Sequence, residues 1–274
     1  MNIQAEQSLV NGIVQGVGFR PTVWHIAQRF NLTGSVCNNG NGVLINVLGR
    51  KESIDDFLKT LLDEKPVLSR IDNITRRLQT TPAHTADSFD IIESNKTYIH
   101  TGVTADAATC KQCLDEVLDP SNRRYRYPFS NCTHCGPRIS IIKAIPYDRS
   151  HTSMAKFNLC EQCEQEYNSP DNRRFHAQPN ACPKCGPQLY ITDNTGKKLT
   201  SRDVIGSAVH YLKSHAIVAI KGIGGFHLAV NACDDNAVNT LRQRKSRPYK
   251  PFALMAKDID MIERYCYINE RTMC

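Results

Sequence analysis

The sequence contains 274 residues, of which 41% are hydrophobic and 22% are charged. This composition is that of a globular protein with room for two or three domains, and it excludes a low-complexity or largely disordered chain. The formal net charge of +7 is too small an excess to predict a nucleic-acid partner. The first residues are polar and no apolar run reaches the length of a membrane span, so we expect a cytoplasmic protein without a signal peptide or membrane partner.

Residues 1–94 are predicted to form one domain of mixed strands and helices. Apolar residues that alternate indicate strands, and apolar residues at helical spacing indicate helices. The elements are expected in the order strand, helix, strand, strand, helix, strand, strand, at residues 8–14, 21–30, 34–38, 43–48, 51–62, 74–78 and 89–92. The sequence Asn39-Gly40-Asn41-Gly42 predicts a tight hairpin between the second and third strands. The order is typical of a ferredoxin-like α+β sandwich.

A glycine-rich turn, Gln15 to Arg20, lies between the first strand and the first helix. Its two glycines allow successive backbone N–H groups to converge on one centre, which forms an anion-binding nest. The start of the helix adds partial positive charge, and the Arg20 guanidinium can hold a phosphoryl group through two hydrogen bonds. Asn38 ends the next strand, where its amide can lie beside the turn and hold a water. Taken alone, the turn is weak evidence, and a tight structural turn with a surface arginine is the better interpretation.

Residues 105–190 contain an internal repeat with a period of fifty residues. Eight of the twelve cysteines form four Cys-x-x-Cys pairs, and an Asn-Arg-Arg-aromatic sequence recurs between them. In a chain without an export signal, such pairs favour metal ligation over disulfides. They predict two structural zinc sites, the first with Cys110, Cys113, Cys132 and Cys135 and the second with Cys160, Cys163, Cys182 and Cys185.

The repeat favours this sequential grouping of the cysteine pairs, with a crossed grouping as the alternative. Redox pairs or an iron–sulfur site agree less well with a repeated quartet. A shell of four cysteines leaves no open position on the metal, so each zinc should stabilise its module without catalysing turnover. With eight thiolates bound to two Zn²⁺, the net charge falls to about +3. The remaining cysteines, Cys37, Cys233, Cys266 and Cys274, are expected to be small buried residues.

Residues 197–274 are predicted to form part of an α/β domain. Helices are expected at residues 204–212 and 237–245, and strands at 217–221, 226–230 and 252–256. The segment is short for a mixed domain and shows no closing pattern. Its basic residues Lys221, Lys245, Arg247 and Lys250 suit nucleotide phosphates, although a solvated basic helix end is the alternative. His227 fits either a core histidine or a site residue.

The turn motif and the Gly34-x-Val36-Cys37-Asn38-Asn39-x-x-Gly42 sequence together resemble the acylphosphatase family over residues 1 to about 93. The resemblance implies that Arg20 and Asn38 are the catalytic pair. It also implies that the phosphate is bound by the turn residues Gln15, Gly16, Val17, Gly18 and Phe19. Acylphosphatases hydrolyse carboxyl-phosphate anhydrides without a metal or a covalent intermediate, so positioning and charge must carry the catalysis.

The whole chain resembles the N-terminal part of the HypF carbamoyltransferases, maturation factors for [NiFe] hydrogenases. The motifs that carry this resemblance are the cysteine repeat and the sequences at residues 123–129, 146–149, 173–177, 221–228 and 244–252. The family implies a relay in which carbamoyl phosphate is hydrolysed at the acylphosphatase site. A domain similar to YrdC/Sua5 then joins the carbamate to ATP, with Mg²⁺, as carbamoyl-adenylate. A final domain, absent here, transfers the carbamoyl group to the C-terminal cysteine of HypE.

Two other functions are weighed against the enzyme. The first is a zinc module that binds nucleic acid or protein beside a vestigial acylphosphatase domain, with the Arg-Arg repeats on phosphates. Aromatic stacking platforms and a dense basic stripe are lacking, which disfavours nucleic acid. The second is a scaffold that keeps the phosphatase and zinc but does not bind ATP. The enzyme hypothesis makes the zinc modules a rigid joint, whose loss should undo the docking of the domains.

Overall fold

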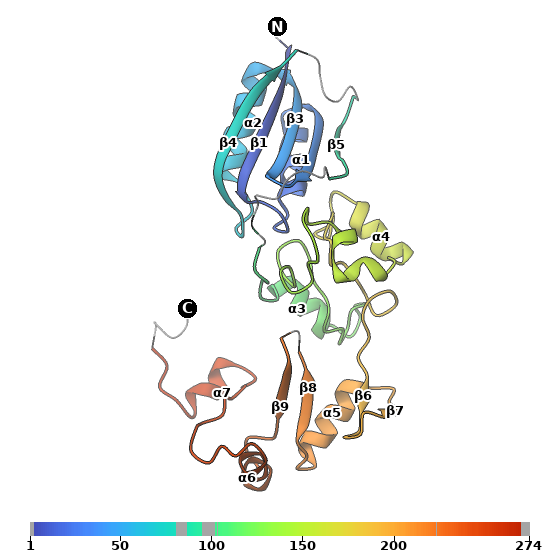
Figure 1. The fold of residues 1–274 in the computed structure, drawn as a ribbon, viewed down its shortest axis with the longest axis vertical. Helices are drawn as coiled ribbons and strands as arrows, with labels where there is room; N and C mark the ends of the chain where they lie inside the picture. Colours follow the sequence, from blue (N-terminus) through green and yellow to red (C-terminus); the bar gives the residue numbers. More distant parts are fainter. Residues whose placement is uncertain (1–2, 81–86, 95–101, 103, 223, 270–274) are drawn as a thin grey trace. The chain divides into compact units, whose positions relative to one another are not determined.

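The computed structural model describes residues 3–80, 87–94, 102, 104–222 and 224–269 (Figure 1). The chain divides into two compact units, Met1–Gln188 and Leu189–Cys274. The first unit contains both the N-terminal sheet and the cysteine-rich region. No helix among the described residues is long and apolar enough to cross a membrane.

The N-terminal sheet has the predicted ferredoxin-like order. Its elements are β1 Ile3–Ile13, α1 Phe19–Arg29, β2 Thr33–Asn39, β3 Gly42–Arg50, α2 Lys51–Asp63, β4 Arg70–Gln79 and β5 Phe89–Ile91. The strands lie in the order β4-β1-β3-β2-β5, in which only β2 and β5 pair in parallel. Since β3 lies between β1 and β2, the turn after β1 and the end of β2 meet at one edge. This arrangement places Asn38 beside the anion loop.

The two helices of this sheet bury apolar faces in one core. In α1 the buried apolar residues include Val23, Ile26 and Ala27, and in α2 they include Ile54 and Phe57. These positions are three or four residues apart, so each set forms one face of its helix. The helix α1 begins two residues earlier than predicted, which places Arg20 in its first turn, held against the loop that precedes it.

The cysteine-rich region has little regular structure beyond two matching short helices, α3 Lys111–Leu118 and α4 Glu161–Asn168. Each begins directly after the first cysteine of its module. Short 3-10 turns follow at Arg149–His151 and Ser153–Lys156. The second repeat packs on α1, where Phe175 meets the Trp24 ring edge-on with centroids 5.7 Å apart. The first unit is therefore held together by contacts between its two halves.

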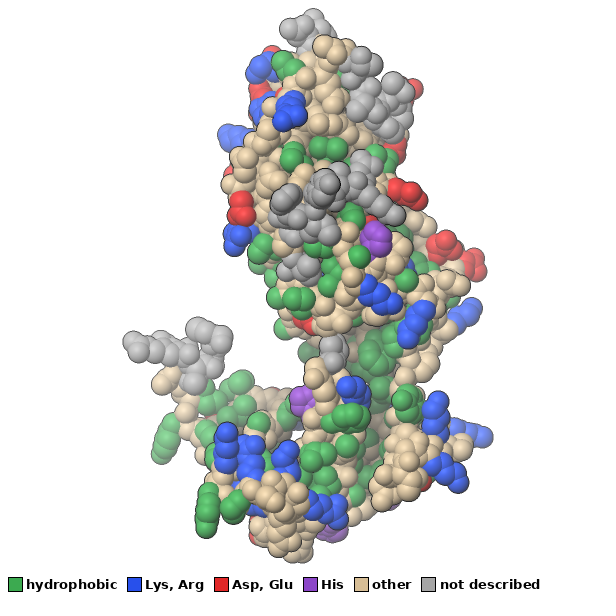
Figure 2. Space-filling model, in the orientation of Figure 1, with side chains coloured by type: hydrophobic (Ala, Val, Ile, Leu, Met, Phe, Trp, Pro, Cys, Tyr) green, Lys and Arg blue, Asp and Glu red, His purple; other side chains and the backbone are tan. Residues whose placement is uncertain are grey.

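The second unit contains small elements around two short hairpins: β6 Ile191–Thr192, β7 Lys198–Leu199, α5 Val204–Lys213, β8 Val218–Lys221, β9 Phe226–Ala229, α6 Asp235–Arg244 and α7 Ile259–Glu263. The helices and strands expected between residues 204 and 245 are found within a few residues of their predicted bounds. Two of its apolar side chains on the hairpin, Phe226 and Leu228, are 70% and 43% exposed. The face of the second unit seen in Figure 2 shows such hydrophobic side chains near basic ones.

The predicted strand at residues 252–256 was wrong. A strand requires a hydrogen-bonded neighbour, and the β8–β9 sheet contains two strands among the described residues. The Phe252 ring instead receives the guanidinium groups of Arg242 and Arg247, at 4.6 and 5.6 Å from its centroid. Cation–π contacts of this kind stabilise the segment without a backbone ladder.

Candidate functional site

The loop between β1 and α1 has the backbone geometry of an anion nest. Gly16 and Gly18 have φ angles of 75° and 81°, a left-handed conformation that only glycine adopts readily. A Cβ added at Gly18 would lie 3.3 Å from Thr133 of the cysteine-rich region, so this residue must also be small. The loop ends in α1, whose first turn adds unpaired N–H groups.

Gln15 fixes this loop through its side chain. Its Nε2 donates to the carbonyl oxygens of Asn39 at 2.7 Å and Gly42 at 2.8 Å, and its Oε1 accepts from the Tyr147 backbone N–H at 2.9 Å. With the amide occupied in this way, any contact of Gln15 with a phosphate must come from its backbone. The phosphate-binding role predicted for residues 15–19 therefore stays a prediction about backbone N–H groups.

Asn38 is 1% exposed, and its amide is fixed in orientation. Its Nδ2 donates to the backbone oxygen of Tyr147 at 3.2 Å. A carbonyl oxygen only accepts, so the nitrogen must face Tyr147 and the Oδ1 must face the other way. The Oδ1 has no hydrogen-bond partner. A buried acceptor without a partner is costly, and here it is available for a water or ligand.

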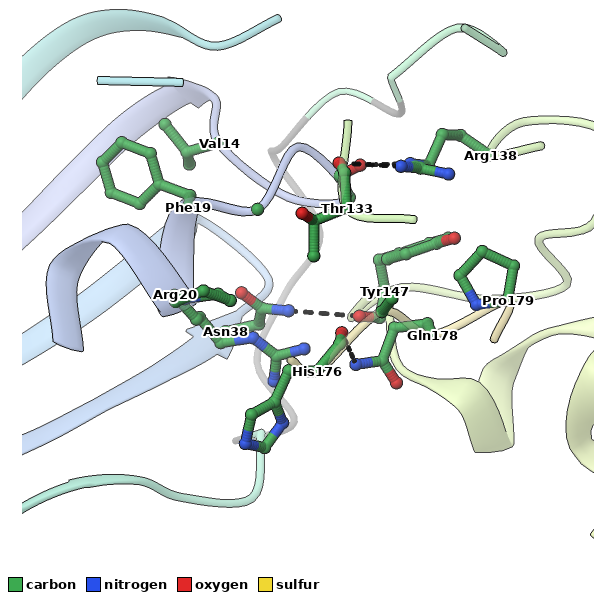
Figure 3. A pocket seen from close by; sticks show the side chains of 14 residues that line it. Val14, Phe19, Arg20, Asn38, Thr133, Arg138, Tyr147, His176, Gln178 and Pro179 are labelled. Atoms are coloured by element: carbon green, nitrogen blue, oxygen red, sulfur yellow. Dashed lines mark hydrogen bonds between the residues drawn. The ribbon is translucent and has the colours of Figure 1, made fainter. Parts of the chain in front are cut away.

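Arg20 lies in the same pocket as Asn38 and the loop glycines (Figure 3). Its Nη1 pairs with Asp148 at 2.8 Å, and the two side chains are 9% and 21% exposed. The pocket encloses about 340 Å³ of empty space, part of it open to solvent. Its wall toward the cysteine-rich region is formed by Thr133, Arg138, Tyr147, His176, Gln178 and Pro179.

The two ring side chains of this wall are uncharged at neutral pH. Burial and the nearby Arg20 charge lower the pKa of His176 to about 4. Burial raises the pKa of Tyr147 to about 12, against the opposing effect of Arg138. The Tyr147 hydroxyl is also buried without a hydrogen-bond partner. The pocket thus combines the guanidinium groups of Arg138 and of Arg20, the latter paired with Asp148, with neutral polar groups, which suits an anion.

Each cysteine quartet is gathered into one cluster in the predicted sequential grouping. Within each cluster the four sulfur atoms lie within 4.8 Å of one another. Neighbouring sulfurs are separated by 3.8 Å in the first cluster, from Cys132 to Cys135, and by 3.7 Å in the second, from Cys160 to Cys182. A tetrahedral zinc with bonds of about 2.3 Å to sulfur requires an edge of about 3.8 Å. The eight cysteines, all free thiols, fit two structural zinc ions.

The Arg-Arg pairs link the two modules crosswise. Arg123 of the first repeat donates to the Cys163 sulfur of the second at 3.3 Å, and Arg173 of the second donates to the Cys113 sulfur of the first at 3.0 Å. The neighbouring Arg124 and Arg174, each 2% exposed, bond the carboxylates of Glu166 and Glu116. The bonds from Arg123 and Arg173 to the sulfur atoms would disperse the negative charge of thiolates that hold a metal.

The contacts of the Arg-Arg pairs argue against a nucleic-acid-binding zinc module. The Arg-Arg pairs were expected on phosphates in that hypothesis, yet their guanidinium groups face the sulfur clusters and the glutamates of the other repeat. Their role in the first unit is to hold the two modules together.

Family comparisons identify the segments. The acylphosphatase family model matches residues 6–91, and the HypF finger model matches residues 109–142 and 159–192. The Sua5/YciO/YrdC model, described as telomere recombination, matches residues 210–273. The HypF carbamoyltransferase of Rhodobacter capsulatus is 48% identical over 94% of this chain and 34% of its own length. The chain belongs to the HypF family.

Two further comparisons support the assignment to the HypF family. A crystal structure described as full-length HypF in the phosphate- and nucleotide-bound form aligns with a TM-score of 0.90 at 48% identity, over 99% of this chain and 35% of that one. An acylphosphatase of Vibrio parahaemolyticus is 40% identical over 28% of this chain and 84% of its own length. The resemblance and fold class stated from the sequence are confirmed. The chain spans about a third of the length of the HypF relatives it matches.

The five residues predicted to bind nucleotide lie on separate elements of the Sua5/YrdC-like segment. Lys221 and His227 belong to the β8–β9 hairpin, and both are exposed. Lys245 follows α6, and Lys250 lies in the next loop. Arg247 is partly engaged within its own loop, because its Nη2 donates to the Pro251 carbonyl oxygen at 2.9 Å. The nucleotide assignment stays a prediction.

Two predictions about the cysteines outside the four Cys-x-x-Cys pairs were wrong. Cys37 is buried as expected, but Cys233 and Cys266 are exposed, and Cys274 lies outside the described residues. Both exposed cysteines belong to the second unit, where the described residues bury few side chains.

The residues of the cysteine-rich region that lie near Arg20 and Asn38 were not predicted as site residues from the sequence of this HypF-family chain. Tyr147, Asp148 and His176 lie in the motifs at residues 146–149 and 173–177, which carried the family resemblance. Their motif positions were a usable signal. Their contact with Arg20 and Asn38 was not predictable without the fold, because it joins residues about a hundred positions apart.

Proposed function

We propose that this chain hydrolyses carbamoyl phosphate, as the first step of carbamoyl transfer in [NiFe]-hydrogenase maturation. The observation that carries the proposal is the pocket that joins the two nest glycines, the Arg20 guanidinium and the unpartnered Oδ1 of Asn38. An acyl phosphate needs this set: donors for the phosphoryl oxygens and an acceptor that orients the attacking water.

In the proposed reaction, the backbone N–H groups of the loop and Arg20 bind the phosphoryl oxygens. A water donates one hydrogen bond to Asn38 Oδ1, which turns its lone pair toward phosphorus. The water oxygen attacks in line, the bond from phosphorus to the carbamoyl oxygen breaks, and that bonding pair leaves with carbamate. Carbamoyl phosphate and water thus give carbamate and dihydrogen phosphate, with total charge conserved. Carbamate is a weakly basic leaving group, so its departure needs no general acid, and the lowered pKa of His176 leaves no imidazolium at the site to act as one.

We further propose the later steps for the full-length protein. The Sua5/YrdC-like segment joins carbamate to ATP, with Mg²⁺, giving carbamoyl-adenylate and pyrophosphate, and Lys221, His227, Lys245, Arg247 and Lys250 contact the nucleotide. The carbamoyl group then passes to the C-terminal cysteine of HypE in the cytoplasm. Membership of the HypF family and the name carbamoyltransferase of its relatives support this sequence of steps.

The eight cysteines are proposed to hold two zinc ions of structural function. Zinc supplies folding energy to modules that have few apolar residues of their own. The chain's residues around the clusters, such as Arg123 and Arg173, donate to the sulfurs and connect the two modules. The pocket wall is thereby held against the acylphosphatase-like sheet.

The proposal is tested by phosphate release from carbamoyl phosphate with the zinc-loaded chain. Arg20→Ala removes the phosphate-binding guanidinium and should lower kcat/KM by about 10²–10³. Arg29→Ala is the matched control, because Arg29 lies on the same helix and pairs with Glu64 on the surface. The control should stay within twofold of the parent. Full activity of Arg20→Ala with its zinc content intact would contradict the proposed mechanism.

A further inference from the structure

Arg138 is the most completely bonded buried cation of the first unit. Its side chain follows the last cysteine of the first cluster by three residues and is 2% exposed. A guanidinium has five N–H donors, and each of the five here reaches a backbone carbonyl oxygen. The acceptors are Gly16 for Nε, Cys135 and Pro137 for Nη1, and Cys132 and Thr133 for Nη2.

These bonds satisfy the donors of Arg138 without cancelling its charge. Among the described residues, no carboxylate forms an ion pair with this guanidinium, whereas Arg20 in the same pocket pairs with Asp148. The nearby Asp106 accepts from the backbone N–H of Arg138 instead, at 2.7 Å. With zinc bound, the net negative first cysteine cluster lies on one side of this charge, next to the Cys132 and Cys135 carbonyls that Arg138 bonds, and the pocket lies on the other.

The Arg138 side chain packs against the anion loop between β1 and α1. A Cβ placed on Gly16 would be 3.2 Å from Arg138 Cδ, so the arginine stem lies directly on the loop. Arg138 also lines the same pocket as Arg20 and Asn38 (Figure 3). Its Nε bond holds the Gly16 carbonyl, and in a trans peptide the next N–H points the opposite way. Arg138 therefore fixes the direction of the Val17 N–H, one of the donors of the nest.

We propose that Arg138 is a positioning residue of the acyl phosphate site, supplied by the zinc region. It holds the Gly16–Val17 peptide in its anion-binding orientation and places a positive charge at the wall of the pocket that binds the phosphoryl group. The proposal rests on the acyl phosphate hydrolysis inferred above. It also connects the first cysteine cluster to the nest, because one side chain bonds the carbonyls of Cys132, Cys135 and Gly16.

The test compares Arg138→Gln and Arg138→Lys in the zinc-loaded chain. The inhibition constant of inorganic phosphate is measured with KM and kcat for carbamoyl phosphate and with zinc content. Arg138→Gln should weaken phosphate inhibition at least tenfold with two zinc ions retained. Arg138→Lys keeps the positive charge. Its inhibition constant for phosphate should lie at least a third of the way, in log units, from the Arg138→Gln value back to the parent value. Lys143→Gln is the control: this cation also belongs to the cysteine-rich region, is exposed and does not line the pocket, so its loss should leave phosphate inhibition within twofold.

A purely structural role predicts a different pattern. Gln and Lys would then be equally impaired, or phosphate inhibition would be unchanged in Arg138→Gln, and either result overturns the proposal. If Arg138→Gln does not fold, the parent protein provides the test through an NMR titration. Its Arg138 Nε–H signal should shift when inorganic phosphate is titrated, and an unshifted signal at saturation contradicts the proposal. If Arg20→Ala loses activity but the Arg138 variants show none of these effects, only the role of Arg138 is rejected. If Arg20→Ala keeps the hydrolysis rate of the parent, the proposed hydrolysis itself is rejected.

Discussion

Asn38 donates its amide hydrogen to the backbone oxygen of Tyr147 at 3.2 Å, across 109 positions of the sequence. One bond thereby joins the acylphosphatase-like sheet to the zinc region and sets which way the Asn38 amide faces. The proposed active site thus draws on two segments, and several measurements can separate their contributions.

Replacing Asn38 tests the water-orienting role. Asn38→Ala removes both the acceptor for water and the bond to Tyr147, so kcat should fall by about 10²–10³ while KM changes little. Steady-state kinetics with carbamoyl phosphate measure both constants. Asn73→Ala on the exposed part of β4 serves as the control and should behave as the parent. A large rise in KM with unchanged kcat would assign Asn38 to substrate binding instead.

Asp148 is expected to weaken phosphate binding. Its carboxylate pairs with Arg20 at 2.8 Å and adds negative charge where the phosphoryl group must bind. Asp148→Asn keeps an oxygen acceptor for Arg20 but removes the charge, so KM and the inhibition constant of phosphate should fall by about three- to tenfold. Titration of the enzyme with phosphate checks this. Weaker binding in the variant would mean that the carboxylate serves only to hold Arg20.

Removal of zinc should abolish hydrolysis although neither ion takes part in it. The zinc region supplies Tyr147, His176 and Arg138 to the pocket, and its modules have too few apolar residues to keep their fold without metal. A chelator should release two zinc ions per chain, and phosphate release should fall in step. Readdition of zinc should restore it. Full turnover by a zinc-free chain would show that the acylphosphatase-like segment acts alone.

The pH dependence of stability should report His176. Its pKa is lowered to about 4 by burial and by Arg20, below the value of about 6.5 in an unfolded chain. The unfolded state therefore binds the proton more readily, so the stabilising effect is complete above pH 6.5 and is lost as the pH falls toward 4. Between pH 7 and pH 5 this loss amounts to about 2 kcal/mol.

His176→Asn provides the comparison, because asparagine tolerates the positive φ of 52° at this position. Urea unfolding at the two pH values gives the change in the free energy of unfolding for each protein. The variant should lose about 2 kcal/mol less than the parent over this range. An equal loss in both proteins would show that His176 titrates normally in the folded state.

Local signals made much of the first unit predictable. The Asn39–Gly42 hairpin, the glycine turn before α1 and the four cysteine pairs each depend on neighbouring residues, and each is found where the sequence places it. The acylphosphatase-like order of strands follows from these elements. The glycine turn between β1 and α1 was therefore identifiable before the fold was known, whereas its phosphate-binding role stays a prediction.

Long-range contacts explain what the sequence did not predict. Arg124 reaches Glu166 across 42 positions, and Arg174 reaches Glu116 across 58, so the Arg-Arg motif alone did not reveal its structural role. Residues 252–256 have the composition of a strand but no neighbouring strand among the described residues. The motif at residues 146–149 did not reveal the contacts of Tyr147 and Asp148, because their partners Asn38 and Arg20 lie in the distant acylphosphatase-like segment.

The central claim is water attack on phosphorus in the pocket of Arg20 and Asn38. It is tested most directly by turnover of carbamoyl phosphate in water enriched in ¹⁸O, with mass analysis of the phosphate released by the zinc-loaded chain. The account predicts one ¹⁸O atom in each phosphate, formed at a rate that Arg20→Ala lowers by about 10²–10³. Unlabelled phosphate, or labelled phosphate formed at the parent rate by Arg20→Ala, would contradict it.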